Sequence, residues 1–503
     1  MKKLNKEEIL EKILIIFLVM QPLFDLKIFY NSISTLIRTI FIVILFGIYF
    51  FNSKNKKKYI LIIYPILLCI YFIFHHLNAI NFKSFVPGNF NYSIIKEMLY
   101  FLKMIVPILL IYVLYKSKLK DNKINFIIKS IVVIISLIII ITNLLGISYG
   151  SYSDSLIKSN FISWFDSDNN YTYKDLASKG LFEFANQISA VLLMFLPFII
   201  YEAISNKKLK NICILIINVW ALILLGTRVA SLGVGIVFVY TICSIVFIKI
   251  VKKDKVDFKL KKIINVFPIL LIYFLLLPIN PVNNRISEIN NQIDVETSST
   301  VYEEMSSDSL QNIDESGVVE ENVNESFNIE KLKLQYIEEN YKTKLINEDF
   351  ILNRYPYKYD VEFWTNILNE DVSLRTNYRY LEKQMVKRVV QINNNPSDIF
   401  LGITNTRLQN IFNIEQDFVV QYYALGIMGF ILVFATYILL LLYYIYRVIG
   451  SKLSCLNITN ILAFITILMI FVIAYNSGNL FNSLSFTIYF AIVCYKLYNV
   501  QED

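Results

Sequence analysis

Residues 124–145 read INFIIKSIVVIISLIIIITNLL, and Lys129 is the only charged side chain among them. A helix needs about 20 mostly apolar residues to cross a bilayer, which this run provides. Similar runs recur along the 503-residue chain, which is 56% hydrophobic and 17% charged. A soluble domain has about 25% charged residues. Most of the chain therefore faces lipid, which excludes a soluble enzyme and a nucleic-acid-binding module.

The apolar runs predict an all-α polytopic membrane protein with about twelve transmembrane helices. The twelve runs are 9–25, 33–51, 59–76, 97–115, 124–145, 183–203, 210–226, 229–249, 263–280, 416–444, 457–475 and 482–498. Lysine and arginine gather in every second connection, including 52–58, 116–123, 204–210 and 249–262. Basic connections remain in the cytoplasm. The sequence therefore predicts a protein of the cytoplasmic membrane with both termini inside.

One connection is much longer than the others and divides the chain into three parts. Residues 1–280 hold runs one to nine, 281–415 form an extracytoplasmic loop, and 416–503 hold the last three runs. Residues 281–330 are acidic and rich in Ser and Asn, which is typical of a disordered segment. Residues 331–415 have a helical, aromatic pattern. We expect a folded half in this loop, with tyrosines that offer faces for stacking.

Metal and disulfide chemistry have little support in the sequence. The five cysteines show no Cys-x-x-Cys spacing, and His75 and His76 are the only histidines. This predicts no zinc site, no cofactor and no obligate metal. The histidine pair suits packing or hydrogen bonding better than catalysis. Asp166 and Asp168 could hold a divalent cation, or they could be a chance pair in a polar loop.

Charged residues in or beside membrane runs are costly and mark candidate sites. Arg228 lies in the tight turn after Gly226, where its guanidinium could bind a phosphate or extend to the membrane interface. Arg38 and Asp25 are close enough in a predicted hairpin to form a structural ion pair. Lys103, within the fourth run, could extend to the interface or line a cavity.

Two acids open the tenth run. Glu415 is followed by Tyr422, Gly426 and Gly429 at helical spacing, so we expect it to face a neighbouring helix at a close approach. Asp417 points to roughly the opposite side. Residues 413–417 could also be a simple helix cap. One of the two acids therefore faces a shared interior, where it could act as a general base.

Basic residues also gather in the folded half of the loop. The run from Leu374 to Ile392 is predicted as one helix with basic residues about four apart on one face. These are Arg375, Arg379, Lys383, Lys387 and Arg388. Arg407 follows on the return to the membrane. We expect these arginines to bind an anion.

The chain resembles the O-antigen ligase and O-antigen polymerase family of bacterial membrane glycosyltransferases with a C-type fold. The resemblance covers the number of runs and the large loop between the ninth and tenth. Locally it rests on Gly180 with Asn186, on Gly226-Thr227-Arg228, and on Glu415-Gln416 followed nine residues later by Gly426-Ile-Met-Gly429. The ligases have histidine where this chain has Glu415, which favours a polymerase.

The resemblance implies a metal-independent glycosyltransferase that acts on an undecaprenyl-diphosphate-linked oligosaccharide at the outer face of the membrane. Glu415 or Asp417 would be the base, and Arg228 would stabilise the diphosphate. Other candidates for binding the diphosphate or glycan are Arg407, Arg375, Arg379, Arg38, Lys103, Asn186 and Tyr422. Alternatives are a ligase for a lipid, wall-polymer or protein acceptor, a flippase for the same glycan, and a structural membrane protein. Expected partners are membrane lipid and a polysaccharide flippase or chain-length regulator.

Overall fold

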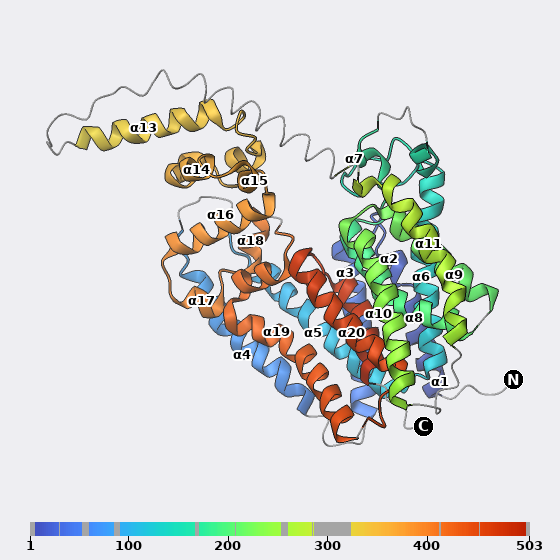
Figure 1. The fold of residues 1–503 in the computed structure, drawn as a ribbon. Helices are drawn as coiled ribbons and strands as arrows, with labels where there is room; N and C mark the ends of the chain where they lie inside the picture. The colour runs from blue at the N-terminus through green and yellow to red at the C-terminus, as the bar shows by residue number, and fades with distance from the viewer. Residues whose placement is uncertain are drawn as a thin grey trace. The chain divides into compact units, whose positions relative to one another are not determined.

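The computed structural model describes residues 6–29, 31–52, 60–84, 91–165, 171–206, 208–252, 260–283, 285, 323–411, 414–451 and 453–498. In these residues the chain is helical and has no strand, and its extended pairings are isolated bridges such as Leu26 with Phe182. The protein is therefore an all-α protein, as the sequence predicts (Figure 1).

The helices follow the apolar runs of the sequence. The first eleven are α1 (Lys6–Val19), α2 (Gln21–Phe24), α3 (Asn31–Asn52), α4 (Ile60–Ile80), α5 (Ile94–Ser117), α6 (Asp121–Leu144), α7 (Tyr173–Leu176), α8 (Ala185–Ser205), α9 (Leu209–Leu225), α10 (Arg228–Lys252) and α11 (Phe267–Leu276). Then come α13 (Val323–Asn340), α14 (Val361–Leu368), α15 (Val372–Arg375), α16 (Tyr378–Asn393), α17 (Ser397–Leu401), α18 (Asn405–Ile411), α19 (Asp417–Gly450), α20 (Ile458–Asn476) and α21 (Leu484–Tyr498).

Nine helical segments of the described chain are long and apolar enough to cross a membrane. They lie in α3, α4, α5, α6, α8, α10, the segment Ile263–Asn283, α19 and α20. The helices α9 and α21 are apolar but shorter. The predicted first run is divided between α1 and α2, since Pro22 stands at the start of α2. These helices confirm a polytopic membrane protein.

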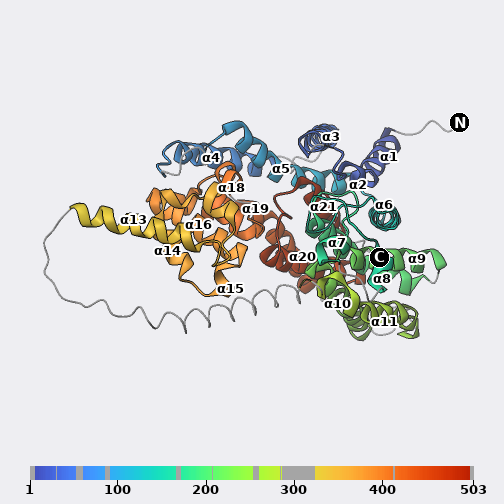
Figure 2. The ribbon, with the colours of Figure 1, turned by 90° about the horizontal axis from the view of Figure 1, so that it is seen from above.

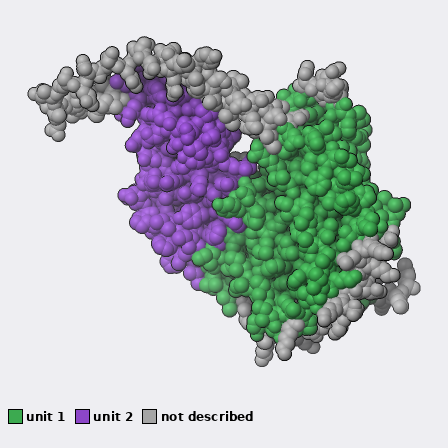
Figure 3. All heavy atoms as spheres, viewed as in Figure 1, with its two compact units in different colours: residues 1–68, 99–285, 431–503 green, residues 69–98, 286–430 purple. Residues whose placement is uncertain are grey.

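The chain packs into two compact units, coloured separately in Figure 3. Unit 1 is Met1–Leu68, Leu99–Arg285 and Ile431–Asp503, and unit 2 is Cys69–Met98 and Ile286–Phe430. This division follows packing, whereas the three-part division predicted from the sequence follows the membrane topology. Three of the four unit boundaries fall inside α4, α5 and α19, and the fourth follows Arg285.

The centre of unit 1 is α8, which packs against α6, α9, α10, α20 and α21 (Figures 1 and 2). Nearly every residue of α8 between Gln187 and Ile204 is buried, and all of α21 between Leu484 and Leu497 is buried. A helix that is apolar all round belongs in such an interior. By contrast, α6 buries one face, with Ile124, Ile128, Ile131 and Ile135 at helical spacing.

Unit 2 has an aromatic core. Trp364 of α14 and Tyr355 are fully buried, and the indole Nε1 of Trp364 donates to the carbonyl of Tyr355 at 2.8 Å. Asp360 caps α14 by accepting from the backbone N–H of Phe363 at 3.2 Å. The same carboxylate accepts from Nε of Arg388 on α16 at 2.8 Å. Asp360 therefore joins α14 to α16.

Two local predictions are wrong. The single helix expected from Leu374 to Ile392 is two helices, because Asn377 has an extended backbone and its side chain accepts from the N–H of Tyr380 to start α16. Arg375 therefore lies on α15, apart from the basic face of α16. Asn has a strong preference for this capping position.

The expected helical row from Glu415 to Gly429 is also interrupted. The helix α19 begins at Asp417, so Glu415 precedes it, and Gly426 has φ 61° and ψ −174° within α19. A Cβ on Gly426 would lie 2.3 Å from the carbonyl carbon of Phe400. The close approach predicted from the two glycines exists, and at Gly426 it is made to the backbone of α17 at Phe400 and Leu401.

Candidate functional site

The turn from α9 to α10 in unit 1 presents an arginine at the surface. The helix α9 ends at Gly226, whose φ of 56° is left-handed and whose Cβ, if present, would lie 2.9 Å from Cβ of Ala177. The hydroxyl of Thr227 accepts from the N–H of Ala230 at 3.1 Å and so caps α10. Arg228, the first residue of α10, is exposed. The turn therefore fixes the backbone on both sides of Arg228.

Tyr152 brings a second arginine to this turn. Its hydroxyl donates to the carbonyl of Gly226 at 2.8 Å, and the guanidinium carbon of Arg285 lies 4.4 Å from its ring centroid. Burial raises the pKa of Tyr152, and the charges of Arg285 and Arg228 oppose that rise. Nε of Arg285 is buried without a hydrogen-bond partner. No carboxylate in the described residues forms an ion pair with either arginine.

Two lysines share one exposed carboxylate in the same unit. Nζ of Lys27 lies 3.0 Å and Nζ of Lys179 lies 3.7 Å from Oδ1 of Asp154, whose side chain is 84% exposed. Nζ of Lys27 also lies 4.5 Å from the ring centroid of Tyr149. Burial lowers the pKa of Lys179. Asp154 therefore pairs with both ammonium groups, and the charge of Glu183 also acts on Lys179.

Arg38 lies in a closed network. Its Nε donates to Oε1 of Gln21 at 2.8 Å, and its Nη2 is paired with Oδ1 of Asp25. Asp25 also accepts from the hydroxyls of Ser485 and Tyr489. Both members of the ion pair are buried. The predicted Arg38–Asp25 pair is present, and its guanidinium is occupied by protein groups.

The other two predicted site residues in unit 1, Lys103 and Asn186, have fewer polar contacts with the protein. Lys103, within α5, is half-buried, and no acidic side chain of the described chain forms an ion pair with it. Asn186 is half-buried at the second position of α8. Its neighbour Gln187 donates to Ser483 at 2.9 Å.

Glu97 of unit 2 is a buried carboxylate that is not among the site residues predicted from the sequence. Its Oε1 accepts from the N–H of Asn405 at 3.0 Å, and its Oε2 accepts from the N–H and the hydroxyl of Thr406 at 2.9 and 2.6 Å. Nε2 of His75 lies 3.1 Å from Oε1. Glu97 therefore holds the start of α18 to the ends of α4 and α5. The sequence signal for this site was the position of Glu97, an acidic residue at the start of the apolar run 97–115.

The ring of His75 lies between two groups that accept hydrogen bonds. Nδ1 lies 2.6 Å from the carbonyl oxygen of Leu401, and Nε2 lies 3.1 Å from the Glu97 carboxylate, which also accepts from Thr406. His75 and Glu97 form a fully buried ion pair.

Arg407 of α18 is also buried in this region. Its Nη2 donates to the carbonyl of Ala79 at 2.8 Å, and its guanidinium carbon lies 4.2 Å from the ring centroid of Phe82 and 5.3 Å from that of Tyr92. Burial lowers the pKa of Arg407 to about 10. These contacts join α18 to the end of α4.

Asp398 completes the polar interior of unit 2. Its carboxylate accepts from Asn78 at 2.8 Å and from Asn393 at 2.6 Å. Burial raises the pKa of Asp398, whereas these hydrogen bonds and the charge of Arg407 oppose the rise. Asn78 also donates to the carbonyl of Gly402 at 3.1 Å. The buried residues thus hold the return segment 398–407 in one conformation.

Glu415 and Arg379 form an ion pair at the surface of unit 2. Nε of Arg379 donates to Oε2 of Glu415 at 2.9 Å, and the side chains are 43% and 40% exposed. Asp417, in contrast, is fully buried. Tyr422 is 40% exposed and its ring lies 5.1 Å from that of Tyr423. Two predicted site residues therefore meet here, in reach of solvent.

Arg375 has a different environment from the one predicted. It is buried, and it donates to the carbonyls of Lys344 at 3.1 Å and Glu370 at 3.3 Å. These bonds fix loop backbone. Asp166, Asp168 and Asn413 lie outside the described residues.

These features define a class of protein, a multi-pass membrane protein with an exposed arginine at one helix turn and an acidic residue before a late span. The chain belongs to the family of O-antigen ligase like membrane proteins, whose model matches residues 7–502. Comparisons with curated proteins and with solved structures found no match. The family supports a role in ligating or polymerising a lipid-linked glycan in a membrane.

Proposed function

We propose that this protein polymerises a glycan carried on undecaprenyl diphosphate, at the outer face of the cytoplasmic membrane, for a surface polysaccharide. The observation that carries the proposal is the pair Arg228 and Arg285 around Tyr152, since neither has an ion-pair partner in the described residues. A diphosphate offers such arginines several oxygen acceptors. Lys103, which has no ion-pair partner in the described residues, adds positive charge in the same unit.

The cations have a role in the reaction itself. Negative charge accumulates on the diphosphate as its bond to the sugar breaks, and fixed cations stabilise that charge best where water is excluded. The exposed position of Arg228 suits a substrate that arrives from the membrane. Arg407, Arg375 and Arg38 donate to protein groups, so we assign them to holding the fold.

The acceptor hydroxyl must lose a proton as it attacks the anomeric carbon. Glu415 is our candidate base, because its carboxylate is in reach of solvent and is held by Arg379. Asp417 is the second candidate. Tyr422 offers an exposed ring for the glycan. No step in this mechanism draws on a metal.

The alternative reaction in this family is ligation to a lipid, wall polymer or protein. The chemistry at the anomeric carbon is the same, and only the acceptor differs. Glu415 at the position of the ligase histidine supports polymerisation. Both reactions require a lipid-linked glycan, which distinguishes them from a flippase that only moves it.

The test uses purified protein in proteoliposomes with a synthetic polyprenyl-diphosphate oligosaccharide. We expect longer lipid-linked products, resolved by mass. Glu415→Gln should reduce the rate by about 10²–10⁴-fold, and Arg228→Gln by about 10²–10³-fold. Glu362→Gln, at an exposed acid paired with Arg388, is the matched control. Movement of the glycan across the bilayer without any new glycosidic bond would overturn the proposal.

A further inference from the structure

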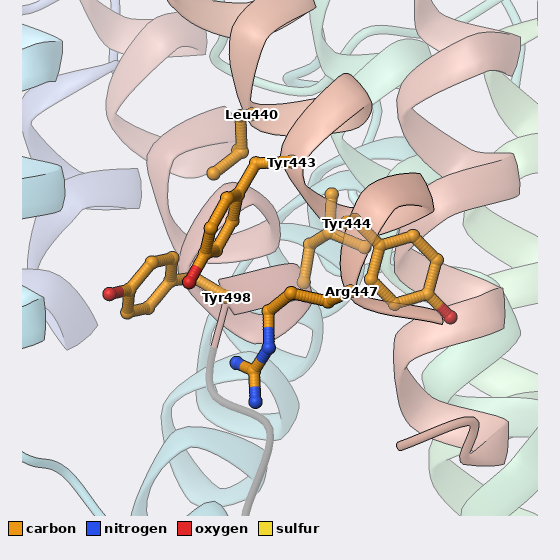
Figure 4. Close-up of a pocket in the computed structure, with 6 residues that line it drawn as sticks. Leu440, Tyr443, Tyr444, Arg447 and Tyr498 are labelled. Carbon is orange, nitrogen blue, oxygen red and sulfur yellow. The ribbon is translucent and has the colours of Figure 1, made fainter. Parts of the chain in front are cut away.

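The ends of α19 and α21 in unit 1 enclose a small pocket. It is lined by Leu440, Tyr443, Tyr444, Arg447, Leu497 and Tyr498. In the view of Figure 4, Tyr443 and Tyr498 lie on one side of the Arg447 side chain and Tyr444 lies on the other. The guanidinium of Arg447 is therefore surrounded by tyrosine rings. No residue that we assign to glycan transfer lines this pocket.

Arg447 lacks an oxygen acceptor in the described residues. Its side chain is half-buried, and its one hydrogen-bond partner is Sγ of Cys455 at 4.0 Å. Sulfur is a weak acceptor, whereas a guanidinium has five N–H donors. In Figure 4 the hydroxyl of Tyr444 points away from the guanidinium, so this residue contributes its ring to the pocket. A half-buried guanidinium without an oxygen acceptor in the described residues indicates an external group with oxygen atoms.

A second cation lies at the same aromatic cluster. The ring of Tyr498 lies 4.8 Å from that of Tyr115 and 6.0 Å from that of Tyr443. Nζ of Lys116, in the last turn of α5, lies 5.4 Å from the ring centroid of Tyr115. Two cations on one group of tyrosines favour an anion over a neutral ligand.

The surface of α19 beside the pocket is apolar. Leu439, Leu442, Tyr446 and Ile449 are 55–74% exposed, as expected for side chains that face lipid. A ligand that combines an anionic head with acyl chains fits the pocket and this surface together. Free phosphate would contact only the pocket and not the apolar surface beside it.

We infer that this pocket binds the headgroup phosphate of an anionic phospholipid. The phosphate accepts from the guanidinium of Arg447, Lys116 adds attraction, and the acyl chains lie along Leu439 and Leu442. The basic connections of the sequence predict that this end faces the cytoplasm, where a pocket between helices can bind anionic headgroups. This inference is independent of the proposed transferase reaction.

The experiment is a lipid titration of the intact protein in detergent micelles, read by native mass spectrometry. Phosphatidylglycerol, phosphatidylcholine and inorganic phosphate are the three probes. We expect phosphatidylglycerol to bind, phosphatidylcholine to bind at least tenfold more weakly, and phosphate alone to bind weakly and compete poorly. Arg447→Gln should weaken phosphatidylglycerol about tenfold, the scale of one charged hydrogen bond.

Two further variants test whether the charge of Arg447 itself determines lipid affinity. Arg447→Lys keeps the charge and should retain part of the affinity, and Lys333→Gln, an exposed lysine of α13, should retain all of it. Equal binding of the two lipids, or equal affinity of Arg447→Gln and Lys333→Gln, would overturn the inference. Tight binding of inorganic phosphate would assign the site to free phosphate and would also overturn it.

Discussion

Nε2 of His75 lies 3.1 Å from Oε1 of Glu97, and both side chains are completely buried. The carboxylate also accepts from Asn405 and Thr406, so this ion pair is supported by three further donors. A buried ion pair adds little net stability against an apolar replacement, but removal of one partner leaves the other charge uncompensated. The pair therefore serves chiefly to fix where α18 begins.

The first prediction concerns this carboxylate. Glu97→Gln removes the buried carboxylate that faces His75 and places an amide N–H₂ against donors of Asn405 or Thr406. We expect the free energy of unfolding to fall by about 3–5 kcal/mol, measured by denaturant unfolding in detergent. Hydrogen exchange at 403–407 should also accelerate. Glu362→Gln, whose side chain is 68% exposed, should change stability by less than about 1 kcal/mol. Equal midpoints for the two variants would show that the buried pair does not hold α18.

The second prediction concerns the break in α19. Gly426→Ala would force a non-glycine residue to φ 61° and place its Cβ 2.3 Å from the backbone of Phe400. Strain and the steric clash together should cost about 3 kcal/mol or more. Gly450→Ala is the control, because nothing lies within 4 Å of its Cβ position. Thermal unfolding of both variants in the same detergent measures the difference, and a Gly426→Ala protein as stable as the Gly450→Ala protein would contradict it.

Hydrophobic run length predicted the class of fold well, because about 20 apolar residues in succession have few options except a helix in lipid. Helix ends were harder to predict. The break at Asn377 depends on one side-chain hydrogen bond, and the break at Gly426 depends on the approach of Phe400, which is distant in sequence. The helical spacing of apolar residues continues through both Asn377 and Gly426, so this spacing did not reveal either break.

The candidate site shows the same limit. Arg38 and Asp25 are close along the chain, so their pairing could be predicted. Glu97 and Thr406 are separated by about 300 residues, and their contact could not be predicted from spacing. Charge alone also cannot distinguish Arg228, which is exposed, from Arg407, which is buried against Phe82. Only the fold determines which arginines remain accessible to a substrate.

The third prediction uses the burial of Lys179. Burial lowers its pKa below the ordinary 10.5, with Asp154 and Glu183 opposing and Lys27 adding to the effect. Between the lowered and the ordinary pKa the unfolded chain binds more protons than the folded chain, so stability rises with pH in that window. Relative to Lys179→Met, the parent should therefore become more stable as pH rises toward 10.5. Thermal unfolding from about pH 8 upward measures the trend, and Lys158→Met, at a lysine 71% exposed, should not alter it. A falling difference would mean that the charged lysine is stabilised in the fold.

The last prediction separates activity from stability at Arg379 and Glu415. Because both side chains are about 40% exposed, water screens their attraction, and a double-mutant cycle should give a stability coupling of only about 0.2–1 kcal/mol. If Glu415 is the base and Arg379 positions it, the same cycle on the glycan-transfer rate should be far from additive. Arg379→Gln alone should slow transfer about tenfold or more, and it should have little further effect once Glu415 is Gln, since there is no longer a carboxylate to position. Arg354→Gln, at a similar ion pair with Asp349, should be neutral in both assays. Additive losses of rate would instead mean that Arg379 and Glu415 contact the substrate independently, and the guanidinium would then belong with the anion-binding residues.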